Sequence, residues 1–312
     1  MIISADLHIT NKTPASRKDD YQAAQDRKLR FICELAKESP PWIIAGDLFD
    51  QAKPGDWIER HVIEMFNEFN VTPILIPGQH DLPGHSLKQI PDSGLGVLKA
   101  ANVIYLLTTP KILEIGTPYF MNLVEPMGIF GCPYGQKPPK NLDWSRIFGL
   151  RVLLWHHMVI QEPLWPGQVA DKAGAILRQN KQFDLIITGD NHQTFVQREM
   201  VYDKDRGQQL LVNPGSMMRS DAKQINHRPC VFRYENRSLE QIFLPIETDV
   251  WDITHLEEKK AKDARISAFV EQLTIESDQS LGVKTFETNV EQFMLKNNIE
   301  SEVQELVREC LS

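Results

Sequence analysis

The chain has 312 residues, a formal net charge of −8 at pH 7, 42% hydrophobic residues and 24% charged residues. This balance excludes a disordered or fibrous chain, and the length suggests two domains, or one large domain with an appendage. The net negative charge of the chain opposes the binding of polyanions. Any contact with nucleic acid must therefore be local, through bound cations or clustered Lys and Arg.

The cysteines and the first residues indicate where the protein works. Cys33, Cys132, Cys230 and Cys310 are scattered with no CxxC pair, which favours a reducing, intracellular setting. The first ten residues lack a basic segment followed by a long apolar run, and no stretch reaches the roughly 18 apolar residues that span a bilayer. We therefore expect a cytoplasmic protein without a membrane partner.

Strand-like and helix-like segments alternate at the start of the chain. Apolar runs at residues 2–5, 42–45 and 73–76 predict strands, and apolar residues at helical spacing predict helices over 21–37 and 57–69. This β-α-β rhythm predicts a parallel or mixed sheet that is flanked by helices.

Shorter strands follow, separated by turns that contain Pro and Gly. We expect strands at 104–107, 112–115, 127–130, 151–155, 184–188 and 209–212, a helix over 170–180, and a hairpin of 231–234 and 239–244 that turns at 235–237. Such a succession suits an α/β, four-layer fold in which two mixed β-sheets pack face to face and are flanked by helices.

Charged helical sequence begins at about residue 249. We expect helices over 255–273 and 286–311, the second of them broken at Asn297-Asn298. The last part carries an apolar stripe at helical spacing, made of Val303, Leu306, Val307 and Cys310. The chain is thus predicted to contain a domain at 1–248 and a short C-terminal helical appendage at 249–312.

Polar residues end five of the predicted strands. They form the segments Asp6-Leu7-His8, Gly46-Asp47-Leu48-Phe49-Asp50, Gly78-Gln79-His80-Asp81, His156-His157 and Gly189-Asp190-Asn191-His192. Each segment alone is also compatible with an ordinary turn, cap or buried histidine. Because the carboxyl ends of parallel strands meet at one edge of a sheet, however, the five segments are expected to converge.

The convergent residues suit a particular chemistry. Mixed carboxylate and imidazole ligands favour divalent ions such as Mn, Fe or Zn. Two such ions about 3.5–4 Å apart can clamp both the attacking and the leaving oxygens of a phosphate ester. The series therefore predicts a metal site that acts on phosphate esters.

This ordered series resembles the pattern of the calcineurin-like metallophosphoesterase family, which is DxH, GDxxD, GNHD, a strand-end His and GHxH, over residues 1–245. Two longer strings, GDLFDQAKPG at 46–55 and NPGSMMR at 213–219, are more narrowly similar to SbcD-type subunits of double-strand-break repair nucleases, including phage versions. The resemblance implies the metallophosphoesterase fold and a hydrolase, a DNA exonuclease or endonuclease in DNA repair or recombination.

The resemblance also implies a role for each matched residue. The metal ligands that it implies are Asp6, His8 and His192 for the first ion, Asp47 for both ions, and Gln79, His156 and Asp190 for the second ion. His80 would not bind metal but would stabilise the transition state or donate a proton, oriented by Asp81. The implied cofactors are two divalent ions, with Mn preferred and Mg, Fe or Zn as alternatives. A hydroxide that bridges the two ions would attack phosphorus.

Two positions depart from the family pattern, and both belong to the second ion. Gln79 stands where the family has Asn, and Asp190 stands where it has the first His of GHxH. Gln extends the reach of the carbonyl by a methylene, and Asp replaces a neutral imidazole with a harder anionic oxygen. These changes predict a second site that favours Mn or Mg, or that binds metal weakly.

Three further residues are candidates for substrate contact. The family ligand is usually the first polar residue after the strand, which favours His156 and leaves His157 to face the cleft or to pack. Arg219 follows the Gly215-Ser216 turn and could contact a phosphate, and so could Arg17. For Arg219 an ordinary surface position without a special role is favoured, and Arg17 is also compatible with a plain loop charge.

DNA is the expected substrate, and other partners follow from the resemblance. SbcD-like subunits use helices after the catalytic domain to bind an SMC-like ATPase of SbcC type, and the C-terminal stripe could do this or pack on itself. The resemblance also implies that residues 249–312 could be a reduced form of the family's DNA-capping domain. A homodimer is left open. So are two other functions: a small-substrate phosphodiesterase or phosphomonoesterase, which the acidic charge favours, and a metal-poor scaffold subunit.

Overall fold

The computed structural model describes residues 1–108, 112–115, 126–145, 149–162, 170–200, 208–252, 254, 265–267, 286–297 and 299–311. The chain divides into two compact units, Met1–Trp251 and Asp252–Ser312, and each is described by itself. Within the described ranges, no helix combines the length and the apolarity that crossing a membrane requires.

The first sheet of the larger unit has six strands in the order β14-β13-β1-β2-β3-β4. Their bounds are β1 (Ile2–Ser4), β2 (Trp42–Ile44), β3 (Ile74–Leu75), β4 (Tyr105–Leu106), β13 (Cys230–Glu235) and β14 (Ser238–Phe243). Strands β1 to β4 run parallel, whereas β13 is antiparallel to both of its neighbours. The carboxyl ends of β1, β2 and β3 therefore lie at the same edge.

The second sheet also has six strands, in the order β11-β12-β10-β7-β6-β5. Their bounds are β5 (Ile112–Ile115), β6 (Met127–Cys132), β7 (Leu150–His156), β10 (Leu185–Gly189), β11 (Phe195–Met200) and β12 (Gln208–Asn213). The four inner strands are parallel and the two edge strands are antiparallel. A small parallel pair, β8 (Val159–Ile160) and β9 (Asp171–Lys172), lies beside this sheet.

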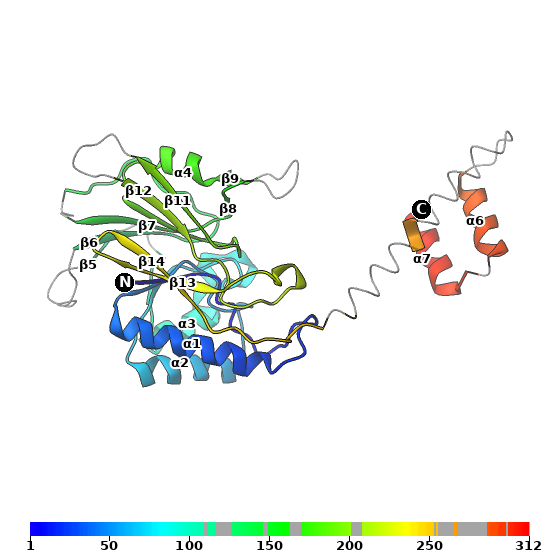
Figure 1. Cartoon of the computed structure of the whole chain (residues 1–312), viewed down its shortest axis with the longest axis horizontal. Coiled ribbons are helices and arrows are strands. Elements are labelled where there is room, and N and C mark those ends of the chain that lie inside the picture. The colour runs from blue at the N-terminus through cyan, green and yellow to red at the C-terminus, as the bar shows by residue number, and fades with distance from the viewer. Residues whose placement is uncertain are drawn as a thin grey trace. The chain divides into compact units, whose positions relative to one another are not determined.

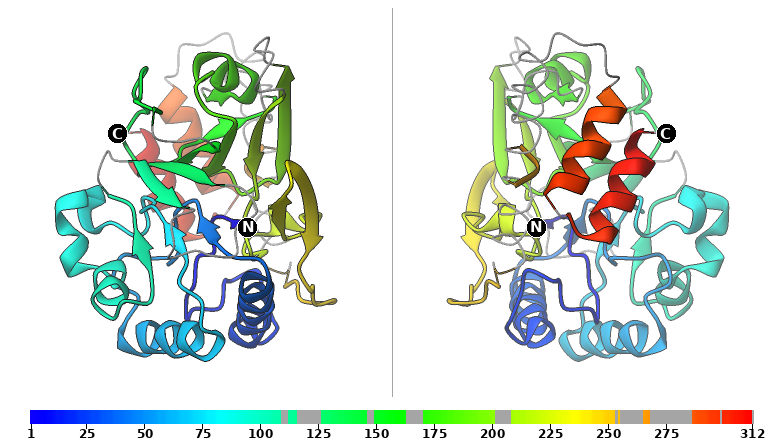
Figure 2. Two further views of the ribbon diagram at one scale, coloured as in Figure 1. Left: turned by 90° about the vertical axis from the view of Figure 1, so that its left-hand side faces the viewer. Right: turned by 90° about the vertical axis from the view of Figure 1, so that its right-hand side faces the viewer.

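Helices cover the outer faces of the two sheets (Figures 1 and 2). Helices α1 (Tyr21–Glu38), α2 (Asp56–Phe69) and α3 (Gly94–Ala100) pack on the first sheet, and α4 (Ala173–Gln179) packs on the second. The predicted architecture of two mixed sheets between layers of helices is confirmed.

The period of two along each strand explains this layering. In β1, Ile2 belongs to the core under the helices and Ile3 to the core between the sheets. In β7, Leu153 faces the core under α4 and Leu154 faces the core between the sheets. Because these strands are buried on both faces, they read as continuous apolar runs.

Several local features differ from the expectations. The helix predicted over 170–180 begins only at Ala173, because the two residues before it pair with β8 as strand β9. Helix α3 and strands β8 and β11 were not predicted; α3 contains two glycines, which weaken its helical pattern. The hairpin turn is confirmed, with Asn236 and Arg237 at φ of 50° and 59°, as a type I′ turn requires.

In the smaller unit the structure describes helix α6 (Phe286–Lys296) and helix α7 (Ser301–Leu311), and the predicted break between them is confirmed. Val290 and Met294 are buried where the helices meet, and Arg308 pairs with Glu291 at 2.7 Å. The helix expected over 255–273 lies outside the described residues for most of its length. The assignment of 249–312 as a partner-binding segment stays a prediction.

Candidate metal centre

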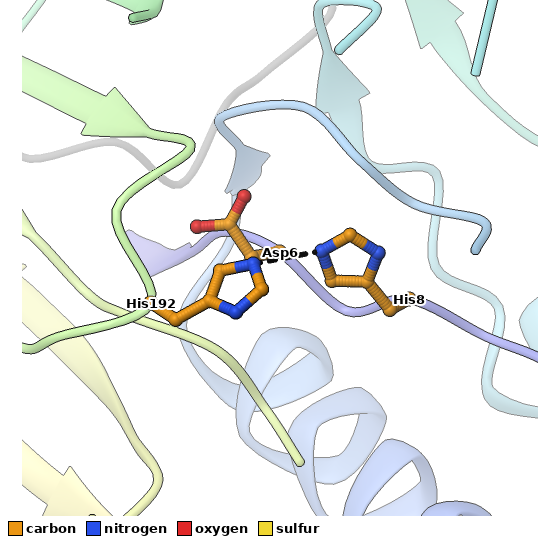
Figure 3. Close-up of side chains that lie close together, drawn as sticks. All are labelled: Asp6, His8 and His192. Carbon is orange, nitrogen blue, oxygen red and sulfur yellow. Dashed lines mark hydrogen bonds between the residues drawn. The ribbon is translucent and has the colours of Figure 1, made fainter. Parts of the chain in front are cut away.

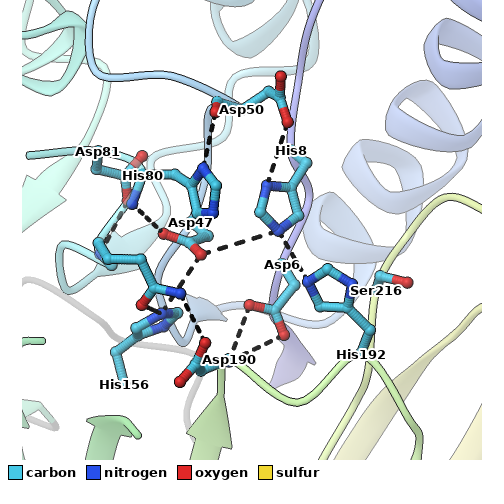
Figure 4. Close-up of polar contacts among 12 residues, drawn as sticks. Asp6, His8, Asp47, Asp50, His80, Asp81, His156, Asp190, His192 and Ser216 are labelled. Carbon is cyan, nitrogen blue, oxygen red and sulfur yellow. Dashed lines mark hydrogen bonds and ion pairs between the residues drawn. The ribbon is translucent and has the colours of Figure 1, made fainter. Parts of the chain in front are cut away.

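The polar segments at the strand ends come together in one place, as the sequence predicted (Figure 4). The segments that follow β1, β2, β3 and β10 contribute side chains to it, and so does the last residue of β7. The cluster contains Asp6, His8, Asp47, Gln79, His80, His156, Asp190 and His192.

The backbone turns sharply where it delivers these side chains. Asp6, His8, Asp47 and Asp190 have φ of 50°, 45°, 50° and 84°, in the left-handed region that residues other than glycine rarely adopt. Neighbouring strand ends stabilise the turns, since the N–H groups of Asp6 and His8 donate to the carbonyls of Gly46 and Asp47 at 3.2 and 3.1 Å. Such strained positions concentrate at functional sites.

The first group consists of Asp6, His8 and His192, whose ligand atoms lie within 4.8 Å of one another (Figure 3). The Nε2 atoms of the two histidines are 3.1 Å apart. Burial lowers the pKa of His8 to about 3 and lowers the pKa of His192 as well. Both imidazoles are therefore neutral at pH 7, which is the form that binds metal ions.

Asp47 occupies the centre of the cluster. Its Oδ1 accepts the N–H of His80 at 2.9 Å, and its Oδ2 lies 3.4 Å from His156 Nε2 and 3.8 Å from His8 Nε2. Burial acts to raise the pKa of Asp47, but the hydrogen bond and charge of His156 outweigh it and hold that pKa below its usual value. Asp47 is thus an ionised carboxylate that faces two sets of candidate ligands.

His156 leads the second group. Its Nδ1–H donates to the carbonyl of Ala45 at 2.7 Å, which directs Nε2 toward Asp47 and places it 2.9 Å from Gln79 Oε1. Gln79 in turn donates from Nε2 to Asp190 Oδ1 at 2.6 Å. Burial alone would lower the pKa of His156, yet Asp47 raises it to about 10. The surrounding carboxylates therefore attract positive charge strongly.

Two glycines leave room for these ligands. A Cβ at Gly46 would meet His156 Nδ1 at 2.2 Å, and a Cβ at Gly78 would meet Asp47 Oδ1 at 2.1 Å. Gly46 also has a φ of 91°, where a side chain is strained. The glycines of the GDLFD and GQHD segments are therefore required by the packing of the site.

The donor set fits divalent metal ions. It combines buried carboxylates with imidazoles at short mutual distances, and the Nδ1–H of His156 is fixed by a backbone carbonyl, as in many metal-binding histidines. The groups of candidate ligands contain Asp6, His8, Asp47, His80, His156 and His192. His80, which the resemblance implies does not bind metal, thus lies within reach of His8 and Asp47 in one of these groups.

The sequence profile of the family described as calcineurin-like phosphoesterase matches residues 2–194, which span this whole constellation up to His192. The chain belongs to this family. Metallophosphoesterases are hydrolases that use divalent metals, and this chain contains groups of residues that could hold such ions.

Comparisons with solved structures found distant similarities. TT1561 of Thermus thermophilus is 13% identical, with 78% of this chain and 98% of that chain covered and a TM-score of 0.45. A 5'-nucleotidase precursor from the same organism is 14% identical, with a TM-score of 0.41, and the alignment covers 86% of this chain and 58% of the nucleotidase. No curated protein matches the sequence.

In this calcineurin-like phosphoesterase, His80 is held differently from the expectation. Its Nδ1–H donates to the carbonyl of Asp50 at 2.9 Å, so the prediction that Asp81 orients His80 is wrong. The buried Asp81 instead accepts the N–H groups of Gly78 and Phe49 at 2.9 and 3.0 Å and thereby ties two ligand loops together. Asp50 was missed, although it closes the GDLFD segment, and its Oδ1 lies 3.8 Å from His8 Nδ1.

The two consecutive histidines at the end of β7 have different surroundings. His156 enters the cluster, whereas His157 is paired through Nε2 with Asp171 at 2.7 Å and stacks on Trp155 with ring centroids 4.2 Å apart. His157 therefore stands outside the ligand groups of the phosphoesterase. Its contact with substrate stays a prediction.

Arg17 and Arg219 make structural contacts, and their contact with substrate stays a prediction. The Arg17 side chain is 1% exposed, pairs with Asp19 at 2.7 Å and donates to the carbonyl of Arg219 at 2.6 Å. Arg219 donates to the carbonyl of Glu247 at 2.7 Å and lies over the ring of Trp251. Both guanidinium groups therefore stabilise the C-terminal end of the larger unit.

Proposed function

We propose that the chain is a metal-dependent phosphodiesterase of SbcD type that cleaves DNA, as an exonuclease or endonuclease in repair or recombination. The observation that carries the proposal is the position of Asp47 between two groups of metal-ligating side chains. A carboxylate in that position can bind two ions at once, which is how two-metal sites clamp a phosphate ester.

Each group would hold one ion. Asp6, His8 and His192 would hold the first, and Asp47 would contribute to both; Gln79, His156 and Asp190 would complete the second. Bound ions supply Lewis acidity, which polarises the phosphoryl oxygens and lowers the pKa of water. Manganese is the proposed metal, because oxygen donors from Gln79 and Asp190 enter the second set.

His80 is the proposed proton donor or transition-state stabiliser. Because its Nδ1–H is committed to the carbonyl of Asp50, its Nε2 is the atom available to substrate. His80 is also exposed, and its ring centroid lies 4.9 Å from that of His8. An imidazole beside the reacting phosphate can donate a proton to the leaving oxygen near neutral pH.

The string NPGSMMR supports the narrower assignment to DNA cleavage, because it lies against the first ligand group. The N–H of Ser216 donates to the carbonyl of His192, and the N–H of Met217 donates to the carbonyl of Asp6, both at 3.2 Å. This string and GDLFDQAKPG carry the resemblance to SbcD-type nucleases, and both therefore contribute to the same site.

An ATPase of SbcC type is the proposed partner, with the protein located in the cytoplasm. Val303 and Leu306 of α7 are 42% and 58% exposed, whereas Val307 packs against the small core of the appendage. The exposed part of the stripe is thus available for a partner helix. A homodimer is an alternative use of the same residues.

The experiment compares three substrates in the presence of Mn²⁺. End-labelled linear duplex DNA, thymidine 5'-monophosphate and bis(4-nitrophenyl) phosphate are each incubated with the full-length protein. We expect release of nucleotides from DNA, hydrolysis of the chromogenic diester, and slower release of phosphate from the monophosphate. Faster hydrolysis of the monophosphate would favour a small-substrate phosphatase, and no hydrolysis of any substrate would favour a scaffold.

A further inference from the structure

Tyr134 lies beside the candidate metal centre, next to His156. Its ring centroid is 6.4 Å from the imidazole centroid of His156, and the two planes meet at 64°. The Tyr134 N–H donates to the carbonyl of Pro77 at 3.1 Å, which fixes it to the segment that leads to Gln79. The residue is nevertheless 36% exposed, so an aromatic face borders the site and remains accessible.

His85 extends this aromatic surface. Its ring centroid is 5.8 Å from that of Tyr134, with an angle of 48° between the planes, and the residue is exposed. His85 has a φ of 55°, in the left-handed region, and its N–H donates to the carbonyl of Leu82 at 3.0 Å. An exposed imidazole in a strained backbone position, next to the tyrosine that borders the ligand cluster, indicates a role in binding.

We propose that Tyr134 and His85 form an aromatic subsite that stacks a nucleobase of the substrate while its phosphate lies at the metal centre. This inference rests on the proposed phosphodiesterase function and names the substrate class that the site prefers, a nucleotide ester. Stacking suits this acidic chain, because a planar base brings no additional charge to be repelled. Every nucleobase offers a π-face, so the subsite accepts bases without selecting a sequence.

The test uses two chromogenic diesters that share one leaving group. Thymidine 5'-(4-nitrophenyl phosphate) carries a base, and methyl 4-nitrophenyl phosphate does not. We compare the ratio of their kcat/KM values in the wild-type protein and in the Tyr134→Ala, Tyr134→Phe and His85→Asn variants. Asn tolerates the left-handed region, so His85→Asn removes the imidazole without straining the backbone. Tyr105→Ala serves as a matched control, because Tyr105 is 48% exposed on the edge strand β4.

We expect Tyr134→Ala to lower the ratio by about tenfold, as loss of one base–aromatic stack predicts. His85→Asn should lower it less, and Tyr134→Phe and Tyr105→Ala should leave it unchanged. Mn²⁺ affinity should be the same in all variants. An unchanged ratio of kcat/KM values in Tyr134→Ala would overturn the subsite. If kcat/KM falls equally for both diesters and Mn²⁺ binds more weakly, Tyr134 only supports His156.

A failure of the proposed function gives a different pattern. If neither diester is hydrolysed, the phosphodiesterase proposal fails, and the subsite is then tested by calorimetric binding with Mn²⁺ present. Thymidine 5'-monophosphate should bind at least about tenfold more tightly than inorganic phosphate, and Tyr134→Ala should remove this difference. Equal affinities for the two ligands in the wild-type protein would overturn the subsite.

Discussion

The backbone N–H of His80 donates to Asp47 Oδ1 at 2.9 Å, which fixes the central carboxylate through one of its oxygens. The other oxygen, Oδ2, is then free to face both His8 and His156. His80, the proposed proton donor, thus uses its backbone N–H to position Asp47, the proposed ligand of both ions. Its side chain plays no part in that contact, so the two roles can be separated by mutation.

Substitution of His80 should remove turnover and leave metal binding intact. His80→Ala keeps the N–H that holds Asp47 but loses the imidazole, so we expect kcat to fall by about 10²–10⁴-fold while Mn²⁺ affinity changes little. Asp47→Asn should lose both activity and Mn²⁺ affinity. Hydrolysis of bis(4-nitrophenyl) phosphate and calorimetric Mn²⁺ titration measure the two properties, and equal metal loss in both variants would contradict this division.

The departures from the family pattern should determine metal preference. Gln79 spans the space between His156 and Asp190, with contacts of 2.9 and 2.6 Å. Gln79→Asn shortens that reach, and Asp190→His replaces an anionic oxygen with an imidazole. We expect the double variant to shift activity from Mn²⁺ and Mg²⁺ toward Zn²⁺ or Fe²⁺. A profile of activity against these ions that matches the wild-type profile would show that neither residue binds metal.

Gly46→Ala should destabilise the protein and displace His156. The new Cβ would lie 2.2 Å from His156 Nδ1 at a φ of 91°, so both a clash and backbone strain follow. We expect a loss of about 2–5 kcal/mol in the free energy of unfolding by urea, together with weaker Mn²⁺ binding.

Gly55→Ala provides the matched control for Gly46→Ala. Gly55 has a φ of 101°, yet a Cβ there would meet nothing within 4 Å. It should therefore cost only about 1–2 kcal/mol of strain and leave Mn²⁺ affinity unchanged. An equal loss of unfolding free energy in the two variants would mean that the clash with His156 does not contribute to the destabilisation of Gly46→Ala.

The pair of Lys28 and Glu247 should make stability depend on pH. The side chain of Lys28 is 2% exposed and contacts Glu247 at 2.9 Å. Although burial acts to raise the pKa of Glu247, the hydrogen bond and charge of Lys28 hold that pKa below its ordinary value. A carboxylate with a depressed pKa stabilises the fold above its unfolded-state pKa, and this contribution is lost as the pH falls through the folded-state pKa.

Glu247→Gln tests this pH dependence. We expect it to lower the free energy of unfolding by about 1–3 kcal/mol at pH 7. The difference from wild type should shrink as the pH falls below 4.5, the ordinary pKa of a glutamate, and should be absent in strong acid. Glu240→Gln, in an exposed pair with Arg233, should change stability by about 0.5 kcal/mol or less. A loss for Glu247→Gln that is independent of pH would contradict the assignment.

Most of the candidate site could be predicted from the sequence, because the relevant signals are local. Asp6, Asp47 and His156 each end or follow an apolar strand, and parallel strands bring their carboxyl ends together. The sheet architecture could also be predicted from the sequence, because strands that are buried on both faces give continuous apolar runs.

The remaining features depend on contacts between distant segments. Asp81 turns toward backbone N–H groups of the loop after β2, and nothing in its local sequence distinguishes this from a contact with His80. Arg17 is buried because the carbonyl of Arg219, 202 residues away, accepts its N–H. The aromatic pair of His85 and Tyr134 likewise joins two segments that the sequence gives no reason to connect.

The chain is proposed to hydrolyse phosphodiesters with metal ions held around Asp47. The most direct measurement is hydrolysis of bis(4-nitrophenyl) phosphate by protein that has been treated with a chelator and then titrated with Mn²⁺. We expect no activity after chelation, recovery as Mn²⁺ is added, and no recovery in Asp47→Asn. Activity that survives chelation, or that returns equally in Asp47→Asn, would contradict the account.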